Sequence, residues 1–254
     1  MKKFLLALLV ATAISPAMAK DGPYKMANPL YRPAADKYIV GGEINYARSP
    51  KKNSVGQPKA ENYAIEPSFV YGITNKLSVD GSIGYGRTKF KSGALKGSKR
   101  NNYGAEANLS YLLASADNFD FNANAGLFYQ KFRNKIAGTN SGHRSGADIG
   151  LKVGKKVDNI TPYFGVGFIS PLWSSRGTGT GTETYINPGV YVDLTKQLAL
   201  DVSYTSVTHQ AATYQAVLDI YANSDIVFGV GAYFVHPESY TNEYGALVNV
   251  KFGF

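Results

Sequence analysis

Apolar and polar residues alternate along most of this chain, and this alternation constrains the fold more than any other feature. In the segment 38–46, Tyr38, Val40 and Ile44 fall on one face of an extended chain and Glu43 falls on the other. The same period recurs, clearly or less uniformly, at 63–73, 77–85, 103–113, 119–129, 147–153, 161–172, 185–194, 197–207, 213–222, 225–235 and 243–254. A period of two is typical of β-strands with one apolar face and one polar face. The sequence therefore predicts an all-β fold of about 12 strands, with about 10 or 14 as alternatives.

The connections between these segments alternate in length. Short polar turns are predicted at 74–76, 115–118, 158–159, 195–196 and 223–224, and longer or loop-like connections at 48–61, 90–101, 133–143, 174–183, 208–212 and 236–242. Up-and-down antiparallel barrels of the outer membrane have tight turns at one end and longer loops at the other. Aromatic residues such as Tyr63, Tyr85 and Tyr111 near the segment ends fit two girdles at the membrane interfaces. The pattern predicts a transmembrane barrel whose apolar face meets lipid; a soluble sandwich or barrel stays open as an alternative.

The first residues have the composition of an export signal. Lys2 and Lys3 precede a short apolar run over 4–11, and Ala17-Met18-Ala19 follows as an A-x-A cleavage site. We expect residues 1–19 to be a signal peptide that is cleaved near Ala19, and residues 37–254 to form the barrel. The stretch 20–36, which contains three prolines, is an irregular periplasmic lead that either stays disordered or folds into the lumen.

The end of the chain carries a second location signal. Its alternating apolar residues Val250, Phe252 and Phe254 resemble the C-terminal assembly signal of Gram-negative outer-membrane β-barrels, although Asn249 stands where that signal often has glycine. The resemblance implies a porin-like outer-membrane barrel that is recognised by the barrel-assembly machinery and surrounded by outer-membrane lipid. It does not specify a function, because such barrels include pores, enzymes and adhesins. The absence of cysteine excludes a lipoprotein anchor, disulfides and thiolate chemistry.

Charge is distributed unevenly between the predicted wall and the predicted loops. The candidate pore-lining residues are Glu43, Glu66, Asp80, Glu106, Asp120, Asp148, Lys152, Asp193, Asp201, Asp219 and Lys251. The candidate basic rim consists of Lys51, Lys52, Lys91, Lys96, Lys99, Arg100, Arg133, Lys135 and Arg144. The acidic wall either favours cations in an open pore or packs against lysine and tyrosine side chains and fills the lumen. The rim either contacts lipopolysaccharide phosphates, steers anionic solutes, or is an ordinary solvated loop surface.

One motif raises the question of catalysis. His143-Arg144-Ser145 resembles the His-x-Ser of outer-membrane phospholipase A and of lipid A deacylases, in which base and nucleophile sit on the outer wall. Here Gly146-Ala147-Asp148 follows the serine, and no orienting residue is evident on the next strand, so the triad is incomplete. We therefore expect no enzyme, no catalytic residue and no cofactor. We also expect no metal site, since His209 and His236 lack further ligands at known spacings. A nucleic-acid partner is not expected either.

The sequence favours a narrow porin-like channel for passive diffusion of small hydrophilic solutes. In this interpretation Glu43, Glu66, Glu106 and Asp148 set selectivity in the middle of the pore. A lower group lines the periplasmic exit and consists of Asp80, Asp120, Asp193, Asp201 and Asp219. The alternatives are a non-conducting structural or adhesive barrel that presents basic loops to lipopolysaccharide or host surfaces, and a lipid-active esterase that uses Ser145.

Overall fold

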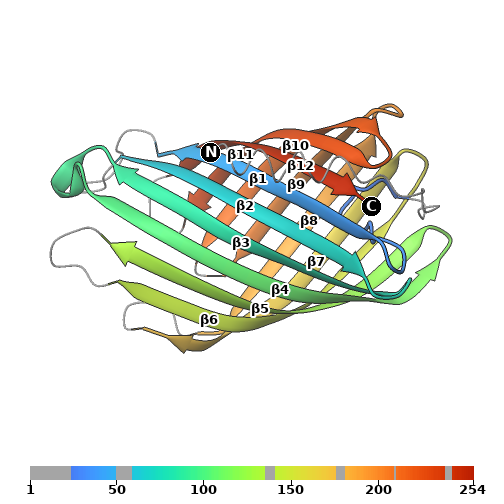
Figure 1. Ribbon diagram of the computed structural model, residues 1–254, viewed down its shortest axis with the longest axis horizontal. Helices are drawn as coiled ribbons and strands as arrows, with labels where there is room; N and C mark the ends of the chain where they lie inside the picture. Colours follow the sequence, from blue (N-terminus) through green and yellow to red (C-terminus); the bar gives the residue numbers. More distant parts are fainter. Residues whose placement is uncertain (1–23, 50–58, 135–140, 176–180, 209, 238–241) are drawn as a thin grey trace.

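The chain forms a closed barrel of antiparallel strands in a computed structural model (Figure 1). The structure describes residues 24–49, 59–134, 141–175, 181–208, 210–237 and 242–254. The strands are β1 (Tyr38–Arg48), β2 (Ala60–Gly72), β3 (Leu77–Phe90), β4 (Lys99–Ala116), β5 (Phe119–Asn134), β6 (Gly142–Lys155), β7 (Ile160–Ser174), β8 (Glu183–Asp193), β9 (Leu198–Val207), β10 (Ala211–Asn223), β11 (Ile226–Pro237) and β12 (Glu243–Gly253). A short 3-10 helix, η1 (Gly93–Leu95), lies between β3 and β4. In the described part of the chain, no helix is long and apolar enough to cross a membrane.

The predicted barrel of 12 strands is confirmed, and its apolar side chains point outward. Ile83 is 63% exposed and Leu127 is 61% exposed, although both lie in the middle of long strands. The neighbouring positions in the sequence point into the barrel and are mostly small or polar. Lipid would cover the exposed apolar band, and closure of the sheet satisfies the backbone groups that lipid cannot.

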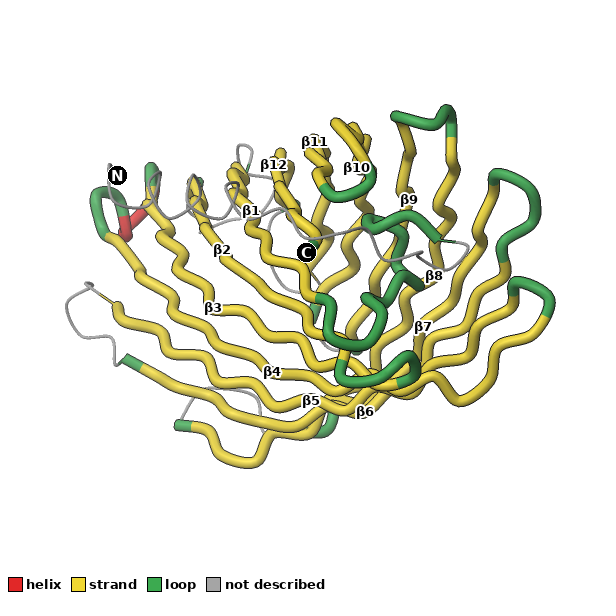
Figure 2. The backbone as a smooth tube through the Cα atoms, turned by 45° about the vertical axis from the view of Figure 1, so that its right-hand side comes forward, coloured by secondary structure: helices red, strands yellow, loops and turns green. Residues whose placement is uncertain are grey.

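Two ends of the barrel can be distinguished by their connections (Figure 2). We call the end with the short connections β2–β3, β4–β5, β6–β7, β8–β9 and β10–β11 the turn end, and the opposite end the loop end. In outer-membrane barrels the turn end is periplasmic. The two chain ends of the barrel also meet at the turn end, where Tyr38 and Phe254 exchange backbone hydrogen bonds of 3.1 and 2.8 Å.

The C-terminal strand closes the barrel. β12 pairs with β1 from Ile39↔Gly253 to Arg48↔Tyr244, so the segment that resembles an assembly signal forms the seam. The rings of Tyr38 and Phe254 stack with centroids 4.9 Å apart. The last residue thus contributes both a ring contact and a backbone pair to the closure.

Prolines interrupt the hydrogen-bond ladder at two places in the wall. The β2–β3 pairing runs to Ile65↔Tyr85 and resumes at Ser68↔Ser82, which leaves Pro67 outside it. The β8–β9 pairing has a similar gap at Pro188. Proline has no backbone N–H to donate, so a gap in the ladder is its direct consequence.

Residues 24–37, which precede β1, fold into the turn end of the barrel. Tyr24, Met26 and Leu30 are buried there in a cluster with inward-facing residues of the wall, including Tyr163 and Tyr191. We refer to residues 24–37 as the N-terminal segment. Of the two conformations considered for this region, the structure has the one that enters the lumen.

Candidate functional site

The lumen contains a cavity of about 260 Å³ that is lined mainly by acidic and amide side chains. Its lining comes from β1, β2, β9, β10 and β12, with Ala27 of the N-terminal segment on the side of the turn end. The ionisable residues of the lining are Glu43, Glu66, Asp201, Asp219 and Lys251. Four carboxylates and one ammonium group therefore surround a space large enough for roughly nine water molecules at about 30 Å³ each.

Two of these carboxylates are direct cross-strand partners. Glu43 on β1 pairs with Glu66 on β2, and both side chains point inward. Like charges in such positions destabilise a sheet. The Ser82 hydroxyl donates a hydrogen bond of 2.8 Å to Glu66, which is possible because Ser82 stands just beyond the ladder gap at Pro67. The pair is thus held in place although it opposes folding.

The next strands along the wall, β3, β4 and β6, add further acids. The Asn108 amide donates a hydrogen bond of 2.9 Å to Asp80. Asp80 also interacts electrostatically with Asp148 and with Lys152 of β6. Glu106 is close enough to Glu66, Asp80 and Asp148 to be affected by their charges. The acids of β2, β3, β4 and β6 therefore act on one another within a single region.

Two lysines offset part of this negative charge. Lys152 interacts with Asp80 and Asp201, and Lys251 interacts with Asp201 and Asp219. Since the region holds seven carboxylates, namely Glu43, Glu66, Asp80, Glu106, Asp148, Asp201 and Asp219, the two lysines leave a net negative lumen. The sequence predicts Asp80, Asp201 and Asp219 at the periplasmic exit. In the structure Asp201 and Asp219 line the same cavity as Glu43 and Glu66, and Asp80 interacts with Asp148 and Lys152. The register and stagger of the strands decide which inward residues meet across the lumen, and the alternation of the sequence does not reveal them.

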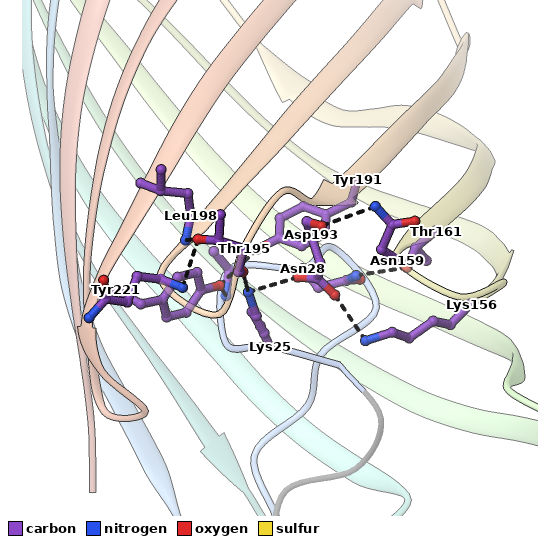
Figure 3. Close-up of polar contacts among 12 residues, drawn as sticks. Lys25, Asn28, Lys156, Asn159, Thr161, Tyr191, Asp193, Thr195, Leu198 and Tyr221 are labelled. Atoms are coloured by element: carbon purple, nitrogen blue, oxygen red, sulfur yellow. Dashed lines mark hydrogen bonds and ion pairs between the residues drawn. The ribbon is translucent and has the colours of Figure 1, made fainter.

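Cations of the N-terminal segment and of the β6–β7 turn neutralise two acids at the turn end, and Figure 3 shows the contacts around Asp193. Arg32 forms an ion pair with Asp120 at 3.4 Å. Lys25 and Lys156 form ion pairs with Asp193 at 3.1 and 3.0 Å. Asp120 and Asp193, which we expected to line an exit, are instead bound by cations of the segment and of the β6–β7 turn.

Burial changes the titration of two groups in the segment. It lowers the pKa of the Arg32 guanidinium, and Asp120 acts in the opposite direction. It raises the pKa of the Tyr24 hydroxyl to about 12, with a further contribution from the charge of Asp120. Neither change removes the charge of Arg32 or creates one on Tyr24 at neutral pH.

A layer of inward-facing tyrosines fixes the segment to the wall. The hydroxyls of Tyr191 and Tyr221 lie 2.7 Å apart, and the backbone N–H of Ala27 donates to Tyr221 at 3.0 Å. Tyr163 donates to Asp201 at 2.8 Å and so links this layer to the cavity. These tyrosines were not among the residues predicted to line the pore; their position on the polar phase of their strands is the signal that could have identified them.

The predicted basic rim divides into several environments. Arg144 stands at the loop end of β6, and its side chain points into the lumen, where it forms an ion pair of 2.9 Å with Glu183. Lys91 pairs with Glu61 at 2.8 Å on the outside of the wall. Lys96, Lys99, Arg100 and Arg133 lie at the loop end. Lys51, Lys52 and Lys135 fall outside the described residues, as do residues 1–19 and His209.

The His143-x-Ser145 motif lies on the outer wall at the loop end. The His143 ring packs against Trp173 with centroids 4.3 Å apart, and its buried Nε2 atom has no hydrogen-bond partner. Ser145 is the cross-strand partner of Tyr129 and Trp173. The described residues also contain no group of three or more His, Cys, Asp or Glu that could hold a metal ion.

Comparison with solved structures identifies the fold. An outer membrane channel from Pseudomonas putida F1 superposes with a TM-score of 0.64 at 13% identity, covering 93% of this chain and 100% of that chain. This chain has the fold of the outer-membrane β-barrels. The β domain of the Bordetella autotransporter BrkA gives a TM-score of 0.56 at 13% identity, with 85% and 98% of the two chains covered. The KdgM porin in complex with a disordered oligogalacturonate gives 0.52 at 8% identity, with 84% and 99% covered.

No protein-family model matches the chain, and no curated protein matches it.

Proposed function

We propose that this outer-membrane barrel is a narrow channel for passive diffusion of small hydrophilic solutes, and that its lumen favours cations over anions. The observation that carries the proposal is the cavity in which Glu43 and Glu66 are direct cross-strand partners and Asp201 and Asp219 complete the lining. A cation in this cavity meets several carboxylates at once, whereas an anion meets mainly Lys251. Rings of acidic side chains have this effect in cation channels.

The size of the effect follows from Coulomb's law. A monovalent cation about 4 Å from one carboxylate gains about 1 kcal/mol even with the dielectric constant of water. That energy corresponds to roughly a fivefold change in occupancy. Solutes with multiple negative charges, such as the oligogalacturonate of the KdgM complex, would be disfavoured by the same carboxylates.

The N-terminal segment favours a second candidate, a barrel that does not conduct. It is bound to β5, β8 and β10 at the turn end through Arg32, Lys25 and Ala27. Conduction would require solutes to pass beside the segment or the segment to move. Such a barrel would serve the envelope as a structural or adhesive component.

Planar-bilayer recording of the full chain separates these candidates. We expect single-channel conductance and, across a KCl gradient, a reversal potential that indicates preference for K⁺. In the Glu43→Gln/Glu66→Gln variant the reversal potential should move toward zero. The matched control is Asp158→Asn, which removes a carboxylate from the β6–β7 turn and keeps a side chain that tolerates the positive φ of 52° at that position. It should leave the reversal potential unchanged.

Three results would contradict the proposal. A wild-type protein that inserts but stays silent would support the non-conducting barrel. A preference for Cl⁻ would refute the role of the acidic lumen. An equal shift in the control variant would show that surface charge, rather than the cavity, sets the selectivity.

A further inference from the structure

Cationic side chains form a row on the outside of the barrel at the loop end. Strand registers place Arg48 of β1, Lys89 of β3 and Lys99 of β4 on one line, with Glu61 of β2 between the first two. A second line, one step nearer the membrane centre, contains Arg87 of β3 and Arg133 of β5, with Asn101 between them, and Lys131 follows on β5.

The row faces outward, as its contacts with outward tyrosines show. The Lys89 ammonium lies 5.2 Å from the centre of the Tyr63 ring, and the Arg133 guanidinium lies 5.8 Å from the Tyr103 ring. Both tyrosines are exposed, as expected for the interface girdle. These cations therefore sit just above the aromatic girdle, at the height of lipid head groups.

An apolar groove of about 360 Å³ lies directly beneath the row. Its lining consists of Ile44, Tyr63, Ala64, Ile65, Tyr85, Arg87 and Lys89. The groove therefore has an aliphatic and aromatic floor and two cations at its edge. The Nε–H of Arg87 is buried and has no hydrogen-bond partner within the described part of the chain. We call the row and the groove together the outer basic face.

The outer basic face occupies one side of the barrel only. β1–β5 lie side by side in Figure 1, and they carry all the cations just named. The whole sequence after Lys156 has three cations: Arg176, Lys196 and Lys251. Lys196 is in the β8–β9 turn, Lys251 is in the lumen, and Arg176 is outside the described residues. On the described outer rim of β7–β12 there are aromatic residues but no lysine or arginine. A general need for a soluble rim would not produce this asymmetry.

The composition of the face specifies the chemistry of its ligand. Its cations are Arg48, Arg87, Lys89, Lys91, Lys99, Lys131 and Arg133, against the single carboxylate of Glu61. Lysine and arginine bind phosphate strongly, and arginine does so in a bidentate manner. The row crosses five strands, a width of about 20 Å at 4.7–4.9 Å per strand, which exceeds the reach of one phosphate. A ligand that carries several phosphates and acyl chains fits both the row and the groove.

We propose that the outer basic face binds the phosphorylated lipid A region of lipopolysaccharide, with the phosphates on the cationic row and an acyl chain in the groove. The direct pairing of Lys89 with Lys99 supports this role, because two like charges in cross-strand positions are unfavourable until an anion lies between them. The site is on the outer wall, so it does not depend on whether the lumen conducts.

The test compares ligands on the full chain in nanodiscs, with binding measured by native mass spectrometry. The probes are bisphosphorylated lipid A, the same lipid A after enzymatic dephosphorylation, and phosphatidylglycerol. We expect bisphosphorylated lipid A to bind at least tenfold more tightly than either other lipid, with an affinity that falls as salt increases. Equal binding of all three lipids would overturn the proposal, as would a preference for phosphatidylglycerol. This comparison needs no variant.

Variants then locate the site. Arg87→Gln/Lys89→Gln should weaken binding of bisphosphorylated lipid A about tenfold or more and leave binding of the dephosphorylated lipid unchanged. The charge-preserving Arg87→Lys/Lys89→Arg should retain most of the affinity. The matched control, Lys155→Gln/Lys196→Gln, removes two cations from the turn end and should bind as the wild type does. An equal loss in the control, or no loss in the first variant, would show that the phosphates bind elsewhere.

Discussion

Replacement of Arg32 by alanine should release the N-terminal segment from the turn end. Arg32 pairs with Asp120 at 3.4 Å, and its guanidinium also contacts Asn122. Their side chains are largely buried, with 13% of Arg32 and 7% of Asp120 exposed. In the Arg32→Ala protein, Asp120 remains buried without its cation as long as the segment is docked. Once the segment leaves, water reaches the Asp120 carboxylate. The free-energy cost of burying this carboxylate without its cation therefore applies only to the docked state.

The expected size of the effect is large. Removal of one partner of a buried ion pair costs about 3–5 kcal/mol. The lower value applies here, because Ser115 also donates a hydrogen bond of 2.6 Å to Asp120 and the lumen can admit water. About 3 kcal/mol corresponds to a shift of roughly 100-fold in the equilibrium between docked and released segment.

The assay uses the absence of cysteine from this chain. An Ala27→Cys protein has one thiol, which is partly buried against the tyrosine layer, and its labelling by a maleimide reports release of the segment. We expect labelling to accelerate by up to 100-fold when Arg32→Ala is added, and single-channel conductance to increase. The control is Lys196→Ala, a cation at the same end of the barrel, which should change neither quantity. Restoration of slow labelling by Arg32→Asp together with Asp120→Arg would tie the effect to the pair.

Two outcomes would refute the reasoning, in different ways. Unchanged labelling in Arg32→Ala would mean that the ion pair does not hold the segment. Faster labelling without a change in conductance would mean that the segment is released but does not obstruct the lumen.

Three further perturbations test the structure of the wall. Arg144→Ala should lower the free energy of unfolding by about 3 kcal/mol, because Glu183 would lose its cation inside the lumen and keep only the hydrogen bond from Gln210. A urea titration followed by tryptophan fluorescence measures this loss, and adding Glu183→Gln should recover part of it. Asn187→Leu should cost about 1–3 kcal/mol in the same titration, since the amide that donates to the Tyr204 carbonyl at 3.1 Å occupies the ladder gap at Pro188. Phe254→Ala should remove the ring contact with Tyr38, which contributes about 0.5–1.5 kcal/mol to the stability of the barrel. The fraction of protein that migrates as a folded barrel in unheated gels should fall accordingly.

The sequence was sufficient to predict the strands, because a membrane requires apolar residues on one face of each strand and so imposes the alternation directly. In β4, Tyr103, Ala105, Ala107 and Leu109 face lipid and the residues between them face the lumen, so a period of two is visible without further information. The same pattern could not show how strands are tilted or which inward residues share a height. The alternation therefore does not reveal that Asp201 lines one cavity with Glu43 and Glu66, although the inward direction of each of them follows from it.

Arg144 shows a second limit of the pattern. It was grouped with loop cations because it follows a long polar connection, but β6 begins before it, at Gly142. Strand ends are weak signals, since polar residues are equally common in loops and on the inner face of a barrel. The N-terminal segment has no periodicity at all, and only the inward tyrosines of the wall, such as Tyr191 and Tyr221, create the surface on which it folds.

On the side of the barrel formed by β1–β4, a surplus of positive charge on the outside and a surplus of negative charge in the lumen are separated by a single layer of backbone. On β2 and β3, Glu66 faces the lumen while Arg87 and Lys89 of the neighbouring strand face the membrane. Alternation makes such a separation easy, because adjacent residues of one strand always point to opposite sides. It also has an electrostatic consequence: anionic lipids gathered on the outer basic face would lie close to the loop-end entrance of an acidic lumen, and both would attract cations to that entrance. The outside and the inside of β1–β4 would then act together on the same solutes, and removal of the outer cations should change the access of ions to the lumen without altering a single residue that lines it.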